Sequence, residues 1–331
     1  MNSFGRVFRV SLWGESHGVQ IGVSVDGVKP GLKLTTDDFT TDLDRRRSGA
    51  KGTTPRKESD TPKIVSGAFN DHTTGAPLTI VFENENTISK DYKGLTTHYR
   101  PSHSDRVADV KYGGFQDYRG GGHFSGRITL PLVAAGVVAK KMLGVEVAIS
   151  SQIVELHGER DSSKFEDIVA KAVKSLDSVG GVIECRVKGI PTGVGEPFFY
   201  SVESVISHLL FSIPAVKGVE FGAGFEATRH FGSENNDNII NAEGTTQSNN
   251  DGGINGGISN GNEIVVRVAI KPTASISSPQ ETFNTESGAV EPLVIHGRHD
   301  ACIALRAGVV VESAIAIALA DLILCVQSPA R

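Results

Sequence analysis

The sequence contains little cysteine: Cys185, Cys302 and Cys325 are the only three in 331 residues, and none forms a CxxC pair. An odd, widely spaced set argues against a disulfide scaffold or a zinc site and favours a reducing cytoplasm. The first six residues lack the apolar core of a signal peptide. Because the net charge is −5, the chain has no overall basic field, and we expect neither nucleic acid nor a membrane surface as a partner.

The most apolar stretch, from 303 to 326, contains Arg306, Glu312 and Asp321. Charges inside such a stretch are typical of a buried helix rather than a membrane span. Glycine is abundant, at 38 residues, and many of these lie in clusters. Clustered glycines indicate tight turns and close approach of the backbone to ligands. No repeat and no clear boundary divides the sequence, so we expect a single domain over 1–331.

Hydrophobic periodicity predicts strands that alternate with helices. The strands are expected over 19–27, 78–83, 145–150, 181–188 and 263–270, and the helices over 34–45, 130–143, 164–176, 201–211 and 303–326. Residues 46–62 and most of 86–129 are predicted to be irregular. The Asn-, Gly- and Ser-rich segment 233–261 fits either a flexible linker or a loop that contacts a ligand. The alternation favours a layered α/β or α+β fold.

Residues 14–18, GESHG, match the GxSxG pattern of serine hydrolases. That motif needs a strand before the serine and a helix after it, whereas the residues that follow here alternate as a strand does. A glycine-bounded turn is therefore the better structural interpretation. His17 in such a turn could lie on the surface or serve in acid–base chemistry.

Two further segments place a histidine beside an arginine and an aspartate. Residues 100–105 read RPSHSD and residues 297–300 read GRHD. A histidine next to an arginine suits proton transfer to an anion, because imidazole titrates near neutrality. In each case the alternative is a polar turn or helix start, in which Ser102, Asp105 or Asp300 bonds the backbone.

Residues 119–127, RGGGHFSGR, lead toward a predicted helix. Three consecutive glycines let backbone amides converge on an anion, and a helix start adds a favourable dipole. The segment is neither a Walker loop nor a dinucleotide fingerprint, and a flexible glycine hinge is the alternative. The basic residues at 45–47, 51, 56 and 57 similarly fit either a solvated face or a binding site for a multiply charged anion.

Taken together and in order, these segments resemble the chorismate synthase family. The resemblance spans nearly the whole chain and rests on LWGESHG (12–18), DLDRRR (42–47), TTPRKESD (53–60), SGAFNDHTTGAPL (66–78), RPSHSD (100–105), RGGGHFSGR (119–127), GIPTGVGEP (189–197), SIPAVKGVEFG (212–222), GGINGGISNG (252–261), KPTASI (271–276) and GRHD (297–300).

The resemblance implies an activity, a cofactor and a fold. The family converts 5-enolpyruvylshikimate 3-phosphate to chorismate by an overall 1,4-anti elimination of phosphate, and it requires reduced FMN without net redox change. The fold it implies is an α+β sandwich whose inner helices are flanked by antiparallel sheets. It also implies a cytoplasmic homotetramer. We expect the monofunctional type, which takes its reduced flavin from an external flavin reductase.

The resemblance also assigns roles to residues. His17 would protonate the departing phosphate, His103 would protonate the reduced flavin, and Asp300 would assist proton removal through the flavin N5. The flavin contacts would be Ser16, His123, Phe124, Ser125, Pro214, Ala215, Gly256, Lys271, Pro272, Thr273, Ala274, Ser275 and Arg298. Arg46, Arg100 and Arg127 would surround the anions of the substrate or of NADP.

The chain departs from the family at two positions of its third motif: His123 stands where arginine is common, and Ile128 where an acid is common. The first exchange removes a permanent positive charge near the expected flavin. Two other hypotheses remain: a flavin- or phosphate-dependent transferase on the same scaffold, and a flavin-binding protein without catalytic activity. The joint presence of His17, His103 and Asp300 argues against both.

Overall fold

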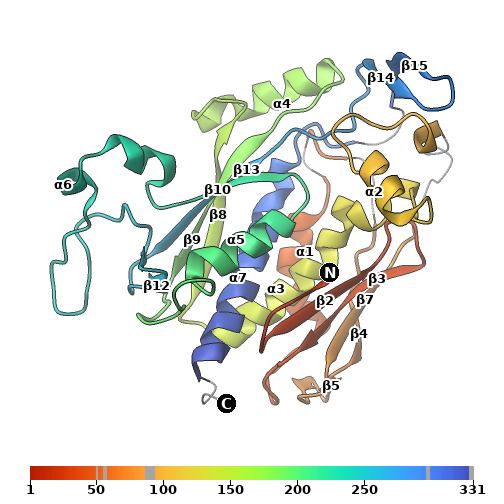
Figure 1. Cartoon of the computed structure of the whole chain (residues 1–331). Helices are drawn as coiled ribbons and strands as arrows, with labels where there is room; N and C mark the ends of the chain where they lie inside the picture. The colour runs from red at the N-terminus through yellow and green to blue at the C-terminus, as the bar shows by residue number, and fades with distance from the viewer. Residues whose placement is uncertain (50, 55–57, 86–93, 296–298, 328–331) are drawn as a thin grey trace.

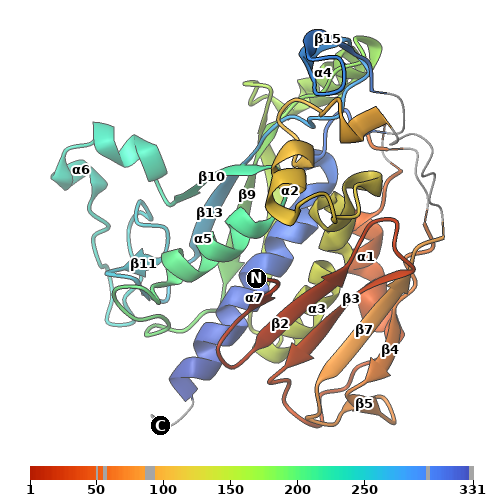
Figure 2. The ribbon, with the colours of Figure 1, turned by 45° about the vertical axis from the view of Figure 1, so that its right-hand side comes forward.

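The chain folds into a sandwich in which two antiparallel sheets enclose a layer of helices (Figure 1 and Figure 2). This computed structural model describes residues 1–331 except 50, 55–57, 86–93, 296–298 and 328–331. One sheet is built from the N-terminal part of the chain and the other from its middle. The predicted α+β class, with inner helices between antiparallel sheets, is confirmed.

The N-terminal sheet has five strands in the order β1-β2-β3-β7-β4. Ile21, Val23 and Val25 of the third strand are fully buried, because alternate side chains of a strand point to one face. The predicted strands at 19–27 and 78–83 are confirmed. The bounds are β1 Ser3–Phe4, β2 Arg9–Gly14, β3 Gln20–Asp26, β7 Leu78–Glu83 and β4 Lys63–Ser66.

The second sheet has four strands in the order β10-β13-β9-β8. The bounds are β10 Val216–Phe221, β13 Ile264–Ile270, β9 Gly181–Lys188 and β8 Ala148–Leu156. The last two predicted strands, 181–188 and 263–270, are confirmed. The strand predicted at 145–150 starts later, because the backbone first closes a turn in which the Val147 N–H donates to the Gly144 carbonyl.

The inner layer consists of α1 Thr40–Arg46, α3 Thr129–Leu143, α5 Val202–Ser212 and α7 Ala304–Gln327. The two longest, α3 and α7, cross closely at Gly136, where an added methyl group would lie 2.2 Å from Ser313 Cβ. By length and composition α7 could cross a membrane, but 78% of its apolar window is buried inside the protein. It is the core helix that the charges within its sequence predicted.

The charges of α7 have dedicated partners. Glu312, fully buried, accepts hydrogen bonds from Arg45, Lys140 and Ser151. Asp321 accepts the backbone N–H groups of residues 6–8, which ties the N-terminal segment to the end of the helix. Buried carboxylates are tolerated because every lone pair finds a donor.

Segment 86–129 contains more helix than its composition predicts. Helix α2 Asp105–Tyr112 is followed by the short 3₁₀ segments η3 Arg119–Phe124 and η4 Gly126–Ile128. Hydrophobic periodicity does not predict α2, because this helix has no buried apolar stripe. Its Val107 and Val110 are exposed.

The remaining elements lie at the periphery. They are η1 Thr36–Phe39, β5 Ala68–Phe69, β6 His72–Thr73, η5 Ser162–Lys164, α4 Phe165–Lys174, η6 Gly224–Arg229, α6 Gly232–Asn235, β11 Ile254–Asn255, β12 Ile258–Ser259, β14 Gln280–Asn284 and β15 Ala289–Leu293. Residues 222–253, which include α6, form an arm that extends away from the sandwich (Figure 1).

Candidate active site

Loops and the ends of helices and strands from distant parts of the chain meet around a cavity of about 1010 Å³. It is bordered by the N-terminal residues 1–4, the 100–104 and 120–127 loops, the end of α5, the segment after β13, and the start of α7. The predicted site residues that line it are His17, Arg46, Arg100, His103, His123, Phe124, Ser125, Arg127, Pro214, Ala215, Lys271, Pro272, Thr273, Ala274, Ser275 and Asp300.

The triple-glycine loop brings the two predicted catalytic histidines together. Gly120, Gly121 and Gly122 have φ of +60°, +81° and +54°, which side chains other than hydrogen rarely adopt. A methyl group on Gly120 would lie 2.6 Å from His17 Nε2, and one on Gly121 would lie 3.5 Å from His103 Cε1. The two imidazoles therefore approach consecutive residues of one loop, and only glycine leaves room for the first.

Ser16 lies in the turn that joins β2 to β3, so a strand and not a helix follows it. This geometry excludes the strand–serine–helix elbow of the serine hydrolases. The serine is fully buried, its backbone N–H donates to the Gly122 carbonyl at 3.1 Å, and it does not line the cavity. The backbone of Ser16 therefore helps to hold the glycine loop in place.

His103 lies beside a buried ion pair. Its Nδ1 is 2.7 Å from Oδ1 of Asp105, and Arg100 donates to both oxygens of that carboxylate. Burial by itself raises the pKa of Asp105, but the hydrogen bonds of Arg100 and His103 outweigh it and hold that pKa far below the usual range. A third donor of Arg100, Nη1, reaches Ser275 Oγ at 3.0 Å, which joins the 100–105 loop to the segment after β13.

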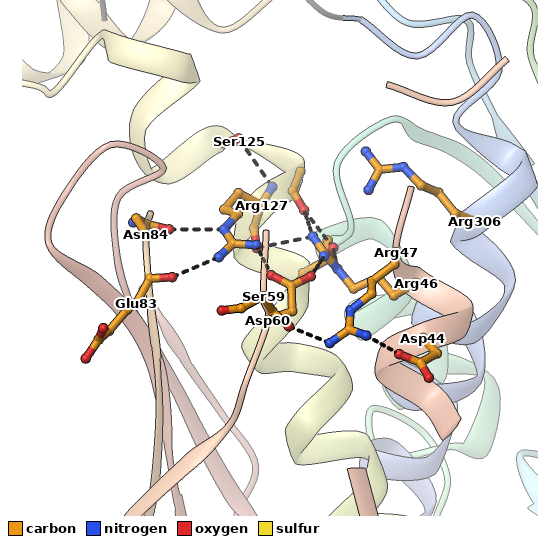
Figure 3. A network of polar contacts seen from close by, with 12 residues as sticks. Asp44, Arg46, Arg47, Ser59, Asp60, Glu83, Asn84, Ser125, Arg127 and Arg306 are labelled. Carbon is orange, nitrogen blue, oxygen red and sulfur yellow. Dashed lines mark hydrogen bonds and ion pairs between the residues drawn. The ribbon is translucent and has the colours of Figure 1, made fainter. Parts of the chain in front are cut away.

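Arg46 and Arg127 share a buried carboxylate, Asp60 (Figure 3). Arg46 also donates to Thr129 Oγ1 and to the Gly126 carbonyl, both at 3.0 Å. Burial, and then the charge of Arg306, lower the pKa of Arg46 to about 9. An anion that entered the cavity would therefore stabilise the charged guanidinium of Arg46.

Arg45 and Arg47, on either side of Arg46, have other side-chain partners, although Arg47 also lines the cavity. Arg45 binds Glu312 in the core, and Arg47 donates to Asp44 and to the Ser59 carbonyl (Figure 3). Of the predicted basic cluster, Lys51 pairs with Glu166 on the surface. The cluster's remaining basic residues, 56 and 57, lie outside the described part of the chain.

Asp300 is held by Arg306, a cavity residue that the sequence interpretation did not include in the site. Arg306 Nε and Nη2 donate to its two oxygens at 3.0 and 2.7 Å, and the Thr54 N–H donates to Oδ1 at 3.0 Å. The sequence could have indicated this role, because Arg306 is a charged residue within a buried apolar helix and such a residue needs a specific partner. The cavity also includes His208 of α5, which no motif indicated.

The two departures from the family pattern have visible surroundings. His123 contacts the Gly14 carbonyl through Nδ1 at 2.7 Å and the Asn2 side chain through Nε2 at 3.2 Å, so it connects the N-terminal segment to the cavity wall. Ile128 is 6% exposed and packs into the main hydrophobic core. Ile128 also borders the cavity, so an apolar residue at this position joins the hydrophobic core to the cavity wall.

Besides Ser16, one other described site residue of the prediction is not at the cavity, and a further one is not described. Gly256 lies in the turn between β11 and β12, with nothing within 4 Å of an added methyl group, and it does not line the cavity. Arg298 lies outside the described residues.

Fold and site together define a protein of the α+β sandwich class whose cavity is lined by histidines, arginines and an aspartate, side chains typical of an enzyme that acts on an anionic small molecule. The chorismate synthase family matches residues 8–324 of the chain. A chorismate synthase of Chitinophaga pinensis is 58% identical over 331 residues, which cover 100% of this chain and 99% of the relative. One of Dehalococcoides mccartyi is 45% identical over 351 aligned positions, which cover 98% of this chain and 96% of the relative.

A solved structure agrees with these relatives. A crystal structure of chorismate synthase matches with a TM-score of 0.75 at 28% identity, and the match covers 97% of this chain and 93% of that one. The chain belongs to the chorismate synthase family. Its function is that of a chorismate synthase, a lyase of aromatic amino acid biosynthesis.

Proposed function

We propose that the chain converts 5-enolpyruvylshikimate 3-phosphate to chorismate in the cavity described above, with reduced FMN as its cofactor. The observation that carries this proposal is that His17, His103 and Asp300 line one cavity although they come from three distant parts of the sequence. Arg46, Arg100, Arg127 and the unpredicted Arg306 line it too. A substrate with two carboxylates and a phosphate needs such fixed positive partners.

The residues present fit a flavin. Among the described residues, the buried hydroxyl of Thr273 has no hydrogen-bond partner, although it belongs to the cavity wall. A buried polar atom of this kind is normally satisfied, so a ligand is the natural partner. Phe124 and Pro214 offer apolar surface nearby, and the cavity volume lies at the upper end of ordinary ligand sites, which leaves room for two molecules.

The residues that would hold the flavin are His123, Phe124, Ser125, Pro214, Ala215 and the segment 271–275. When bound, reduced FMN supplies an electron that the substrate takes up transiently and returns, so that no net redox change occurs. Ser16, Gly256 and Arg298 remain proposed contacts on the family resemblance alone.

Three side chains would take part in proton transfer. His17 donates a proton to the departing phosphate, which is a better leaving group when protonated. His103 holds a proton at Nε2, on the side of the ring away from Asp105. Asp300, kept in place by Arg306 and the Thr54 N–H, would assist removal of the proton from the substrate ring.

The experiment is anaerobic turnover of 5-enolpyruvylshikimate 3-phosphate with chemically reduced FMN, monitored as chorismate and phosphate release, with oxidised FMN as the blank. We expect turnover only with reduced FMN and a fall of about 100-fold or more in the His17→Ala, His103→Ala and Asp300→Asn variants. His230→Ala is the matched control, since His230 is exposed on the arm. Flavin binding without turnover would refute the proposal and leave a non-catalytic flavin protein.

We also propose a cytoplasmic homotetramer of one-domain chains that receives reduced flavin from an external reductase. The single domain is supported by a core of buried residues that extends from Phe8 to Leu322. Assembly is supported by the arm, whose Phe225, Phe231 and Ile239 are 73%, 78% and 72% exposed, because apolar side chains of this kind can be buried between chains. Sedimentation analysis tests assembly, and a monomer at micromolar concentration would contradict it.

A further inference from the structure

The carboxylate of Asp105 contacts the Nδ1 side of the His103 ring in a fixed geometry. Oδ1 lies 2.7 Å from His103 Nδ1 and 2.6 Å from Arg100 Nη2, while Oδ2 accepts Arg100 Nε at 2.7 Å and the Arg100 backbone N–H at 3.2 Å. The side chains of Asp105 and Arg100 are 8% and 4% exposed. Both oxygens are thus occupied, and neither partner can move far without leaving a buried charge unpaired.

Helix capping does not account for this arrangement. Asp105 is the first residue of α2, and the N-cap residue Ser104 makes no side-chain capping bond. The carboxylate of Asp105 instead contacts Arg100 and His103, which precede the helix. Only one of these contacts, to the Arg100 N–H, serves the backbone of the turn. The remaining contacts orient side chains.

We propose that Asp105 is a positioning residue for His103: it holds the proton on Nδ1, so that Nε2 is the nitrogen presented to the cavity. The consequence is a defined tautomer. When the imidazolium gives up its Nε2 proton, the Nδ1–H stays on Asp105, and the neutral ring keeps the orientation that the next proton transfer needs. This proposal rests on the catalytic role of His103 proposed above.

Arg100 acquires a second task in this arrangement. Three of its nitrogens are directed to Asp105 and Ser275, so its main contribution is to fix the carboxylate rather than to bind substrate through a free guanidinium fork. The chain Ser275–Arg100–Asp105–His103 thereby connects the segment proposed to bind flavin with the histidine proposed to act beside it. Lys271, whose Nζ donates to the Ser102 carbonyl at 2.8 Å, anchors the same loop from that segment.

The test compares Asp105→Asn with Asp109→Asn. Asp109 is on the same helix and accepts hydrogen bonds from Tyr99 Oη and Gln116 Nε2 at 3.0 and 3.2 Å, outside the cavity, so it controls for the loss of a helix carboxylate. We expect Asp105→Asn to lower kcat about 100-fold with KM within threefold, as expected when a histidine loses its tautomer. Asp109→Asn should keep kcat within twofold.

A double-mutant cycle separates positioning from general damage. If Asp105 acts through His103, adding Asp105→Asn to His103→Ala should change kcat less than threefold. Full additivity in that background would overturn the proposal, and so would an Asp105→Asn variant with wild-type kcat. If His103→Ala itself keeps full activity, the proposed role of His103 fails first, so the two failures are distinguishable.

A measurement on the unmodified enzyme guards against a variant that does not fold. Nitrogen-15 NMR of histidine-labelled protein, with His103→Ala to assign the signal, reports which ring nitrogen carries the proton in the neutral form. We expect the Nδ1–H tautomer, which is the minor one in water. Observation of the Nε2–H tautomer would overturn the proposal even if every Asp105 variant were inactive.

Discussion

The triple-glycine loop permits a matched test of how the backbone positions His17. Gly120 and Gly121 are neighbours with φ of +60° and +81°, so alanine at either position costs about the same backbone strain, of about 1–2 kcal/mol. They differ in what a side chain would meet. The pair therefore separates loop strain from displacement of the histidine.

The displacement follows from the contacts. A methyl group on Gly120 would lie 2.6 Å from both Cδ2 and Nε2 of His17 and 3.0 Å from Ser16 Oγ, whereas one on Gly121 meets nothing closer than 3.5 Å. Since carbon contacts are favourable only from about 3.5 Å, Gly120→Ala must move the imidazole by about 1 Å. A shift of about that size at a catalytic group can cost about 100-fold in rate.

The assay is anaerobic turnover with reduced FMN, together with thermal unfolding of each variant. We expect similar losses of Tm for Gly120→Ala and Gly121→Ala, a kcat about 100-fold lower for the first, and a loss below tenfold for the second. Equal losses of kcat in the two variants would refute the reasoning. Strain in the loop would then account for the whole loss, and the contact with His17 would contribute none of it.

Three further results are expected. Burial raises the pKa of Glu312, but Arg45 and the charge of Lys140 lower it below 4.5. Glu312→Gln should therefore lower the free energy of unfolding by about 3 kcal/mol at pH 7. The loss should become much smaller as the pH falls below 4.5, because the wild-type carboxylate then becomes protonated as well. Asp321→Asn should cost about 1–3 kcal/mol by denaturant titration, since three backbone N–H groups lose a charged acceptor. Pyrophosphate should raise the Tm of the wild type, and Arg46→Gln should abolish that rise; equal shifts would contradict an anion site at Arg46.

Regular elements with a buried face were predictable. Strands β3, β7, β9 and β13 and helices α3, α5 and α7 follow from the periodicity of their apolar residues, because burial on one face imposes that period on the sequence. Helix α2 was not predictable in this way. Its Val107 and Val110 are exposed, so it has no buried apolar stripe that periodicity could reveal.

The three consecutive arginines at the end of α1, residues 45–47, show most clearly what the local sequence does not predict. Sequence composition offered one interpretation for all of them, either a solvated face or an anion site. Within α1 the direction turns by about 100° per residue, so Arg45 reaches the core carboxylate of Glu312 and Arg46 reaches the cavity. Arg47, one residue beyond the helix, lies at the cavity wall and remains 40% exposed. Their different roles depend on what packs against each direction of α1.

The sequence by itself determined the family and the sandwich class, because these are carried by motifs that follow the family's order along nearly the whole chain, and it supplied the proposal for the proton-transferring residues. Only the tertiary structure decided that His17 and His103 approach adjacent glycines, that Arg306 holds Asp300, and that Asp105 stands behind His103. The physical reason is that such contacts join residues far apart in sequence or depend on the direction in which a turn faces, and neither is encoded in local periodicity.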